Sequence, residues 1–320
     1  MRYQEFLEKT VHRLNEMSDG KTVVEVCIQQ QNNGVQDARF VFRNPDEPLS
    51  PAIGAAPCYD ACQRGMGMEE MCRNIWKVYL EKKPGGNAED MSFLYDAKQV
   101  LQNVVCRVIN HDYNEELLQD VPHRRYLNLA VVYYCVLDRS RLVEGSVMIS
   151  GELLKHLGIS VRELDRFARE NTRRRSPVQF GTIRSAMEDL LTMGDCVRES
   201  RNGAISTEPT IHTEVDQMIA EDEVPLYVLT NRERMYGAYW MTDPEVQERM
   251  AARIGEDYYI LPSSLHECMV VPVSLGWPAQ GLIDMVRDVN RECLAREEVL
   301  ADTIYYYSAK EKKLSLISGR

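Results

Sequence analysis

The sequence lacks long apolar segments. No apolar run reaches the roughly 18 residues that a membrane-spanning helix requires. The N-terminal stretch MRYQEFLEKTVHRLNEM is amphipathic and lacks the apolar core of a signal peptide. We therefore expect a cytoplasmic protein that does not associate with membranes.

Positive charge and glycine-rich motifs are also scarce. The chain has 38 Lys and Arg against 49 Asp and Glu, which gives a net charge of −11. This charge opposes general attraction to phosphate backbones, so nucleic acid is not an expected partner. Neither GxGxxG nor GxxxxGK[ST] occurs. P-loop NTP hydrolysis and Rossmann-type redox chemistry are therefore excluded, and we expect no cofactor.

The nine cysteines do not suggest a disulfide framework. Their number is odd, the chain is long and no signal peptide precedes them, which favours reduced thiols. Cys58, Cys62 and Cys72 approach the spacing of metal ligands, but no histidine lies close in sequence to complete the usual set of four. We expect these thiols to pack in a hydrophobic core, and we expect no metal site.

Hydrophobic periodicity predicts an α+β fold. Apolar positions at helical spacing predict helices over 2–18 and 68–82, and β-branched runs on both sides of Asn32-Asn33-Gly34 predict a hairpin. The pair Asp96 and Gln99 predicts a capped helix that continues to about Asn110. The sequence also predicts a buried strand over 127–137 paired with GSVMIS, helices opened by Ser150 and by Ser160, and a helix over 182–193.

The last third of the chain alternates strand pairs with helices in a ββαββαββ pattern. Its first predicted pair is VPLYVLT with MYGAYWM, joined around Asn231. A helix follows from Asp243-Pro244 to Gly255, and a second covers 279–292. Consecutive strands joined by short turns must pair in antiparallel fashion, so we expect largely antiparallel sheets.

One segment separates two regions of different character. Residues 208–223 hold six acids and no Lys or Arg. We therefore predict an N-terminal α+β region over 1–193, an acidic variable insert or linker over 194–223, and a C-terminal α+β region over 224–320.

The densest group of reactive side chains lies between Ser263 and Cys268. Ser264, His266 and Glu267 are the candidate catalytic residues of a hydrolase or transferase. In an extended chain, same-face neighbours stand about 7 Å apart, so a Ser264–His266 hydrogen bond requires a bend. No GxSxG motif is present, and the HExxH zinc pattern fails at Val270. The alternative is a structural role, with the serines capping a turn and His266 bonded to the backbone.

Two further groups have both functional and structural interpretations. Residues 162–175 contain six arginines against three acids and end in Arg173-Arg174-Arg175. This stretch could bind RNA or phosphate, but we favour a solvated helix face whose arginines pair within the helix or meet the acidic run 208–223. His111 and His123 lie in one loop region, where a ligand site competes with an ordinary surface loop.

Several motifs together resemble an uncharacterised domain-of-unknown-function family that is common in anaerobic gut bacteria. They are YVLTN (227–231), YYILPSSLHE (258–267), EEVLADTIYYY (297–307), the opening MRYQEFLE, the NNGV turn and LLQDVPHRRYLNLAVVYY (117–134). The resemblance covers nearly the whole chain and implies a bacterial protein, but no activity, cofactor or catalytic residue. The chain has Ser50-Pro51-Ala52 where the family commonly has Ser-Pro-Thr.

Because no complete catalytic constellation can be assembled, we expect a non-enzymatic binding or regulatory protein. Its partner is unknown, and a protein is one candidate. The alternatives are the hydrolase or transferase at Ser263–Cys268 and RNA or phosphate binding through Arg173–Arg175.

Overall fold

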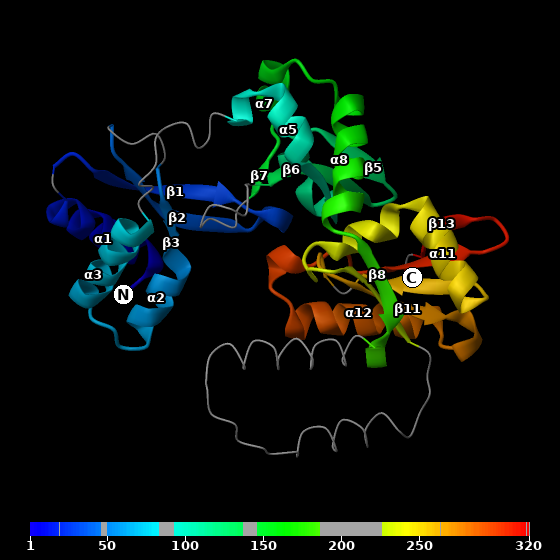
Figure 1. The fold of residues 1–320 in the computed structure, drawn as a ribbon. Coiled ribbons are helices and arrows are strands. Elements are labelled where there is room, and N and C mark those ends of the chain that lie inside the picture. Colours follow the sequence, from blue (N-terminus) through cyan, green and yellow to red (C-terminus); the bar gives the residue numbers. More distant parts are fainter. Residues whose placement is uncertain are drawn as a thin grey trace, which may run out of the picture. The chain divides into compact units, whose positions relative to one another are not determined.

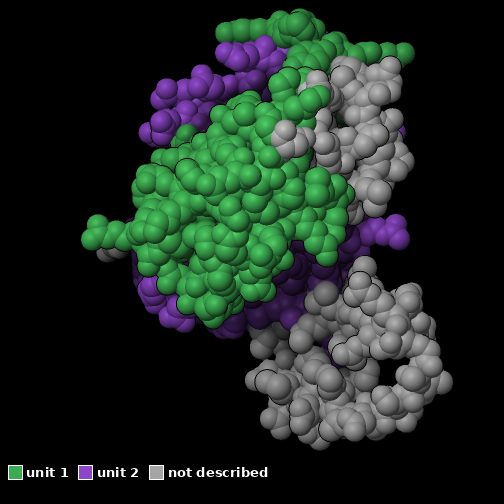
Figure 2. Space-filling view, turned by 90° about the vertical axis from the view of Figure 1, so that its left-hand side faces the viewer, with its two compact units in different colours: residues 1–100, 155–158 green, residues 101–154, 159–320 purple. Residues whose placement is uncertain are grey.

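The fold is described from a computed structural model, which covers residues 1–18, 20–45, 50–82, 93–136, 146–185, 226–262, 264–317 and 319. The chain divides into two compact units (Figures 1 and 2). Unit 1 comprises residues 1–100 and 155–158, and unit 2 comprises residues 101–154 and 159–320. Two helices, α5 (Ala97–Asn103) and α7 (Gly151–Leu157), cross this division in sequence.

Unit 1 packs helices on one face of a three-stranded antiparallel sheet. Its elements are α1 (Tyr3–Met17), β1 (Val23–Gln30), β2 (Gln36–Arg43), β3 (Ala52–Gly54), α2 (Ala55–Gln63) and α3 (Met68–Lys82). The strand order is β1-β2-β3. Phe40 and Phe42 alternate with more exposed residues along β2 and point into the core, where the Phe42 ring stacks on Tyr79 at 4.3 Å. The predicted first helix, hairpin and 68–82 helix are confirmed.

The prediction of one helix from Asp96 to about Asn110 is wrong beyond residue 103. Asp96 does cap α5, because its carboxylate accepts hydrogen bonds from the amides of Lys98 and Gln99. The chain then becomes strand β4 (Val104–Asn110). Its β-branched residues are buried on both faces of a sheet, and the resulting continuous apolar run does not show the alternation of a half-exposed strand.

Unit 2 contains two antiparallel sheets. The first pairs β4 with β6 (Leu129–Val136), and β6 also pairs with β5 (His123–Tyr126) and β7 (Ser146–Met148). Helix α8 (Val161–Arg175) begins at Ser160, whose hydroxyl accepts the Glu163 amide, and it packs on β4. The Thr172 hydroxyl accepts the Cys106 amide at 2.9 Å. The predicted 127–137 strand, its GSVMIS partner and the Ser150 and Ser160 helix starts are confirmed.

The second sheet has the order β13-β12-β10-β11-β9-β8. Its strands are β8 (Val178–Thr182), β9 (Tyr227–Asn231), β10 (Tyr258–Leu261), β11 (Cys268–Pro272), β12 (Ile304–Ser308) and β13 (Lys313–Ile317). Helices α11 (Pro244–Ile254) and α12 (Ala279–Cys293) lie where the sequence predicts them, and α12 buries Leu282, Ile283 and Val286 against the sheet (Figure 1).

The predicted strand over MYGAYWM is wrong. These residues form a turn followed by the 3-10 helix η4 (Gly237–Thr242). Tyr236 adopts a left-handed conformation with φ of 59°, which ends extended structure. β9 instead pairs with β11 and with β8, which lies on the far side of the acidic segment in sequence. The ββαββαββ order therefore holds, with β8 as its first strand.

The acidic segment 208–223 lies outside the described residues, as do residues 186–193 of the predicted 182–193 helix. The boundary between the two compact units lies near Val100, whereas the sequence predicts a boundary at residues 194–223. Because residues 194–223 are not described, their role as a linker stays a prediction. Across the described part of the chain, no helix has the length and apolar character to cross a bilayer.

Candidate functional site

An arginine on a buried strand is the centre of the candidate site. Arg107 is the one half-buried position of β4, whose other residues are buried. Its guanidinium carbon lies 4.1 Å from the centre of the Tyr134 ring and 3.6 Å from that of Tyr236. Its Nη2 donates a hydrogen bond to the Ser146 hydroxyl at 2.8 Å. Two aromatic rings thus hold the cation by cation–π contact.

The charge of Arg107 has little compensation. Desolvation by burial lowers its pKa, because the cation has lost water that would stabilise it. Within the described residues, no carboxylate forms an ion pair with this guanidinium. Stacking engages the faces of a guanidinium and leaves its N–H groups free to donate in the plane of the group. Arg107 therefore retains capacity to bind an anion.

Arg107 lines a pocket of about 720 Å³ in unit 2. We call it the Arg107 pocket. Its walls come from β4, β6, β7, α8 and the residues that follow β9, and Trp240 and other apolar side chains contribute part of them. Its polar lining includes Arg107, Ser146, Thr172, Arg175, Ser176, Asn231 and Glu233. A mainly apolar cavity with a few polar groups is the usual form of a ligand site.

The loop after β9 supplies an acid to the same pocket. The Asn231 side chain closes this loop by donating to the Met235 carbonyl at 2.7 Å and accepting the Met235 amide at 3.1 Å. Glu233 lies within the loop, and its Oε2 is buried without a hydrogen-bond partner in the part of the chain that the structure describes. A buried acceptor of this kind gains free energy when a ligand donates to it.

The residues predicted as catalytic lie in the turn between β10 and β11. His266 Nδ1 accepts the backbone amide of Tyr236 at 3.1 Å, and its Nε2 lies 3.8 Å from Glu298. The Ser264 hydroxyl accepts the amide of His266 at 3.0 Å and is 6% exposed as a residue. Ser264 therefore bonds to the histidine backbone, and no Ser264–imidazole hydrogen bond occurs among the described contacts. The acid nearest the imidazole is Glu298, whereas Glu267 has other interactions.

This geometry resembles a structural turn more than a nucleophile and base. Ser263 lies outside the described residues. The Cys268 thiol is fully buried, and desolvation raises its pKa, so it stays protonated. The catalytic role of Ser264, His266 and Glu267 stays a prediction.

Arg107, Tyr236 and Glu298 are not among the functional residues predicted from the sequence. A lone arginine within the apolar run VVCRVIN is a signal that could have drawn attention to Arg107. Tyr236 and Glu298 carry no local signal, because their roles depend on contacts between distant segments.

The three consecutive arginines at the end of α8 are engaged. Arg173 contacts Asp243 at 2.9 Å and Glu245 at 3.2 Å, and Arg175 donates to the Asn103 side chain at 2.5 Å. Arg174 donates to Asn171 at 3.2 Å. All three arginines therefore contact neighbouring polar groups, and the acids that pair with Arg173 lie at the start of α11. The alternative partner, the acidic run 208–223, lies outside the described residues.

Three of the four cysteines of unit 1 lie in or against its core. Cys72 is fully buried, and Cys58 and Cys62 are partly buried against the same cluster. Desolvation raises the pKa of Cys72 to about 11, so the thiol form predominates at neutral pH. The packing role predicted from the sequence fits this environment.

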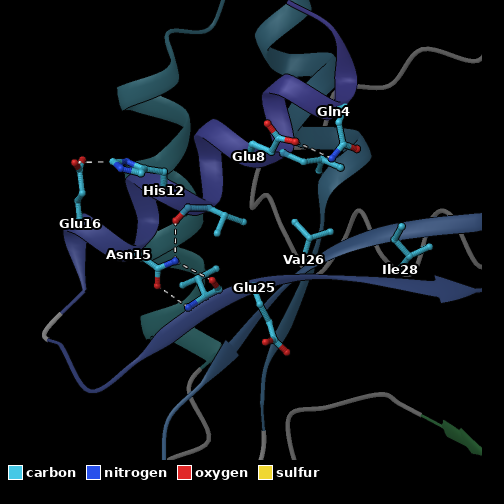
Figure 3. Close-up of a pocket in the computed structure, with 11 residues that line it drawn as sticks. Gln4, Glu8, His12, Asn15, Glu16, Glu25, Val26 and Ile28 are labelled. Carbon is cyan, nitrogen blue, oxygen red and sulfur yellow. Dashed lines mark hydrogen bonds and ion pairs between the residues drawn. The ribbon is translucent and has the colours of Figure 1, made fainter.

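Unit 1 also has a groove between α1 and β1, with a volume of about 910 Å³ (Figure 3). Gln4, Glu8 and His12 line it from the helix, and Val26 and Ile28 line it from the strand. We call it the α1–β1 groove. Its charged residues are bonded to one another or to neighbours, so it presents a weaker chemical signal than the Arg107 pocket.

Comparisons with known proteins place the chain in a family without giving it an activity. Searches of curated proteins and of solved structures returned no match. A family profile described as "Family of unknown function (DUF5688)" matches residues 3–309. Because this match spans nearly the entire sequence, the chain belongs to the DUF5688 family of unknown function.

Proposed function

We propose that the protein is a non-enzymatic binding or regulatory protein whose ligand occupies the Arg107 pocket and carries a carboxylate or phosphate group. The observation that carries this proposal is Arg107 itself, a desolvated cation that lines a cavity and has no ion-pair partner among the described residues. Retaining such a group costs stability, and an anionic ligand offsets that cost.

Glu233 adds a second requirement for the ligand, a hydrogen-bond donor. Its buried Oε2 faces no donor within the described part of the chain. A ligand that presents both an anionic group and an N–H or O–H donor can bind to Arg107 and to Glu233. Amino acids, hydroxy acids and short peptides with a free carboxylate meet this requirement.

A binding role has more support than the two alternatives. The hydrolase or transferase hypothesis lacks a hydrogen bond between the Ser264 hydroxyl and the His266 imidazole among the described contacts, because that hydroxyl accepts the His266 backbone amide instead. The RNA hypothesis relies on arginines that already contact neighbouring groups. A protein partner fits the proposal if its C-terminal carboxylate enters the pocket. The cytoplasmic location and the origin in an anaerobic gut bacterium stay predictions from the sequence.

The test is a ligand screen by thermal unfolding. Full-length protein is heated with phosphate, mono- and dicarboxylates, hydroxy acids, amino acids and short peptides. A ligand that binds the folded state raises the melting temperature in a concentration-dependent manner. We expect at least one anion with a donor group to do so.

Variants then locate the site. Arg107→Met keeps the packing against the two tyrosines but removes the charge, and we expect it to abolish the shift. Arg166→Ala is the matched control, because Arg166 also stacks on an aromatic ring, that of Phe167 at 4.7 Å, but does not line the pocket. An equal shift in Arg107→Met and wild type contradicts the proposal, as does a complete lack of shifts in the screen.

A further inference from the structure

Two histidines that are separate in sequence lie together in unit 2. His111 follows β4 and His123 begins β5, and their ring centres are 6.0 Å apart. Asp112 and Glu115 lie beside His111: one ligand atom from each of these three residues falls within 4.8 Å of the others. The segment between β4 and β5 thus brings two imidazoles and two carboxylates to one surface.

Hydrogen bonds to Nδ1 orient both rings. His123 Nδ1 lies 2.9 Å from the Val121 carbonyl oxygen, which can only accept, so Nδ1 carries the proton. His111 Nδ1 lies 3.1 Å from an oxygen of Asp112, which favours the same tautomer. Nε2 then bears the lone pair in each ring. Histidines that bind metals usually make such a bond through the nitrogen that does not face the ion.

We propose that His111 and His123, through Nε2, and the carboxylate of Glu115 bind a divalent transition-metal ion of the zinc class, and that Asp112 orients the His111 ring through Nδ1. Imidazole ligands suit Zn²⁺, Co²⁺ and Ni²⁺, whereas Mg²⁺ and Ca²⁺ prefer sites made of oxygen alone. With metal–nitrogen distances of about 2.0 Å, two imidazoles on one tetrahedral ion have ring centres about 5 Å apart. The observed separation of 6.0 Å between the ring centres is close to this spacing.

The surroundings favour reversible binding. Asp112 and Glu115 are exposed, so water can occupy a remaining coordination position. One opposing charge is close, since Arg125 Nη2 lies 3.9 Å from the Asp112 carboxylate. Its side chain is 63% exposed and can turn away when an ion binds. The residues of this site do not line the Arg107 pocket, so the inference stands independently of the proposed function.

The test uses Co²⁺ as the probe, because its absorption distinguishes ligand types. Thiolate ligands give intense near-ultraviolet charge-transfer bands, whereas nitrogen and oxygen ligands give only weak visible bands. The distinction matters because Cys27 and Cys293 are free and exposed. Full-length, reduced protein is titrated with Co²⁺ and then with Zn²⁺ in competition, by absorption and calorimetry. We expect one equivalent bound with weak visible bands only.

Three variants test whether the proposed residues bind the ion. His111→Ala and His123→Ala should each weaken Co²⁺ binding at least tenfold. Glu115→Gln, at an exposed position that cannot affect folding appreciably, should weaken it severalfold. The control is His12→Ala, which removes an exposed histidine that lies 3.5 Å from Glu16 in unit 1, and it should leave binding unchanged. Binding dominated by thiolate bands, equal affinity in His111→Ala and wild type, or no binding of either ion would overturn the proposal.

Discussion

The backbone amide of Tyr236 donates a hydrogen bond to Nδ1 of His266 at 3.1 Å. The ring centres of the two residues are 5.2 Å apart, and the Tyr236 ring also lies against the guanidinium of Arg107. His266 therefore connects the turn predicted as a catalytic site to the pocket proposed as a ligand site. This makes it a positioning residue for Tyr236.

Replacing His266 tests that role. We expect His266→Ala to lower the free energy of unfolding by about 1–3 kcal/mol, because the Tyr236 amide loses its acceptor. His266→Asn should recover much of this loss, since Asn Oδ1 is the same number of bonds from Cα as His Nδ1. Denaturant unfolding measures both. A catalytic histidine behaves differently: both variants abolish an activity and leave stability unchanged.

Gly237 should not tolerate a larger residue. A Cβ at this position would lie 2.5 Å from the Asn231 amide nitrogen and 2.7 Å from the His266 carbonyl oxygen. Both are backbone atoms, so Gly237→Ala should destabilise unit 2 by about 2–3 kcal/mol or more. Gly281→Ala is the matched control: it lies in α12 with no atom within 4 Å of its Cβ, and it should stabilise the helix by about 0.5–1 kcal/mol. Similar melting temperatures for the two variants would contradict this prediction.

Asn15 supports the edge of the unit 1 sheet. Its side chain donates to the Val24 carbonyl and accepts the Val24 amide, each at 2.8 Å, as a neighbouring strand would (Figure 3). Asn15→Ala should cost about 1–3 kcal/mol, because both backbone groups lose a partner near a buried residue. Asn15→Asp should also destabilise, since it replaces the donor with an acceptor. Asn74→Ala, on the exposed face of α3, should change stability by less than about 0.5 kcal/mol in the same unfolding assay.

The Tyr306–Asp257 pair should make stability depend on pH at both extremes. The hydrogen bond from the Tyr306 hydroxyl, and after it that from the Ala309 amide, lowers the pKa of Asp257. The same bond to Asp257 raises the pKa of Tyr306 to about 12. The Asp257 contribution is present above its unfolded pKa of about 3.9 and is lost as pH falls through the lower folded value. The Tyr306 contribution is complete below pH about 10 and is lost as pH rises towards 12.

The measurement is the difference in unfolding free energy between wild type and Tyr306→Phe across pH. The difference should be constant from about pH 5 to 9 and shrink on both sides. Taking this difference largely cancels the titration of the other tyrosines. A difference that stays constant up to pH 12 would show that the hydroxyl does not bond to Asp257 in solution.

Local patterns in the sequence were sufficient for most elements of the fold. Asp243 and Ser160 cap helices as their positions predict, and Asn33, in a left-handed conformation, lies in the connection between β1 and β2. Such features depend on residues within a few positions of one another, so a single sequence reveals them. The antiparallel pairing also follows from the short connections between strands.

Tertiary contacts determined the secondary structure of the segments whose local sequence signals conflict. Val104 and Val108 are four residues apart, a spacing that places them on one face of a helix and also on one face of a strand. Pairing with β6 and burial under α8 select the strand. For the 235–241 segment, β8 and β11 already occupy both edges of β9, so no strand position beside it remains.

The candidate site depended on tertiary structure most of all. Its centre joins Arg107, Tyr134 and Tyr236, which come from two strands of one sheet and a loop that follows a strand of another. The sequence determined the residue types, the net charge and the absence of phosphate-binding motifs. Only the packing of the two sheets of unit 2 could determine which cation loses its water and faces a cavity, because desolvation depends on neighbours that are distant in the chain.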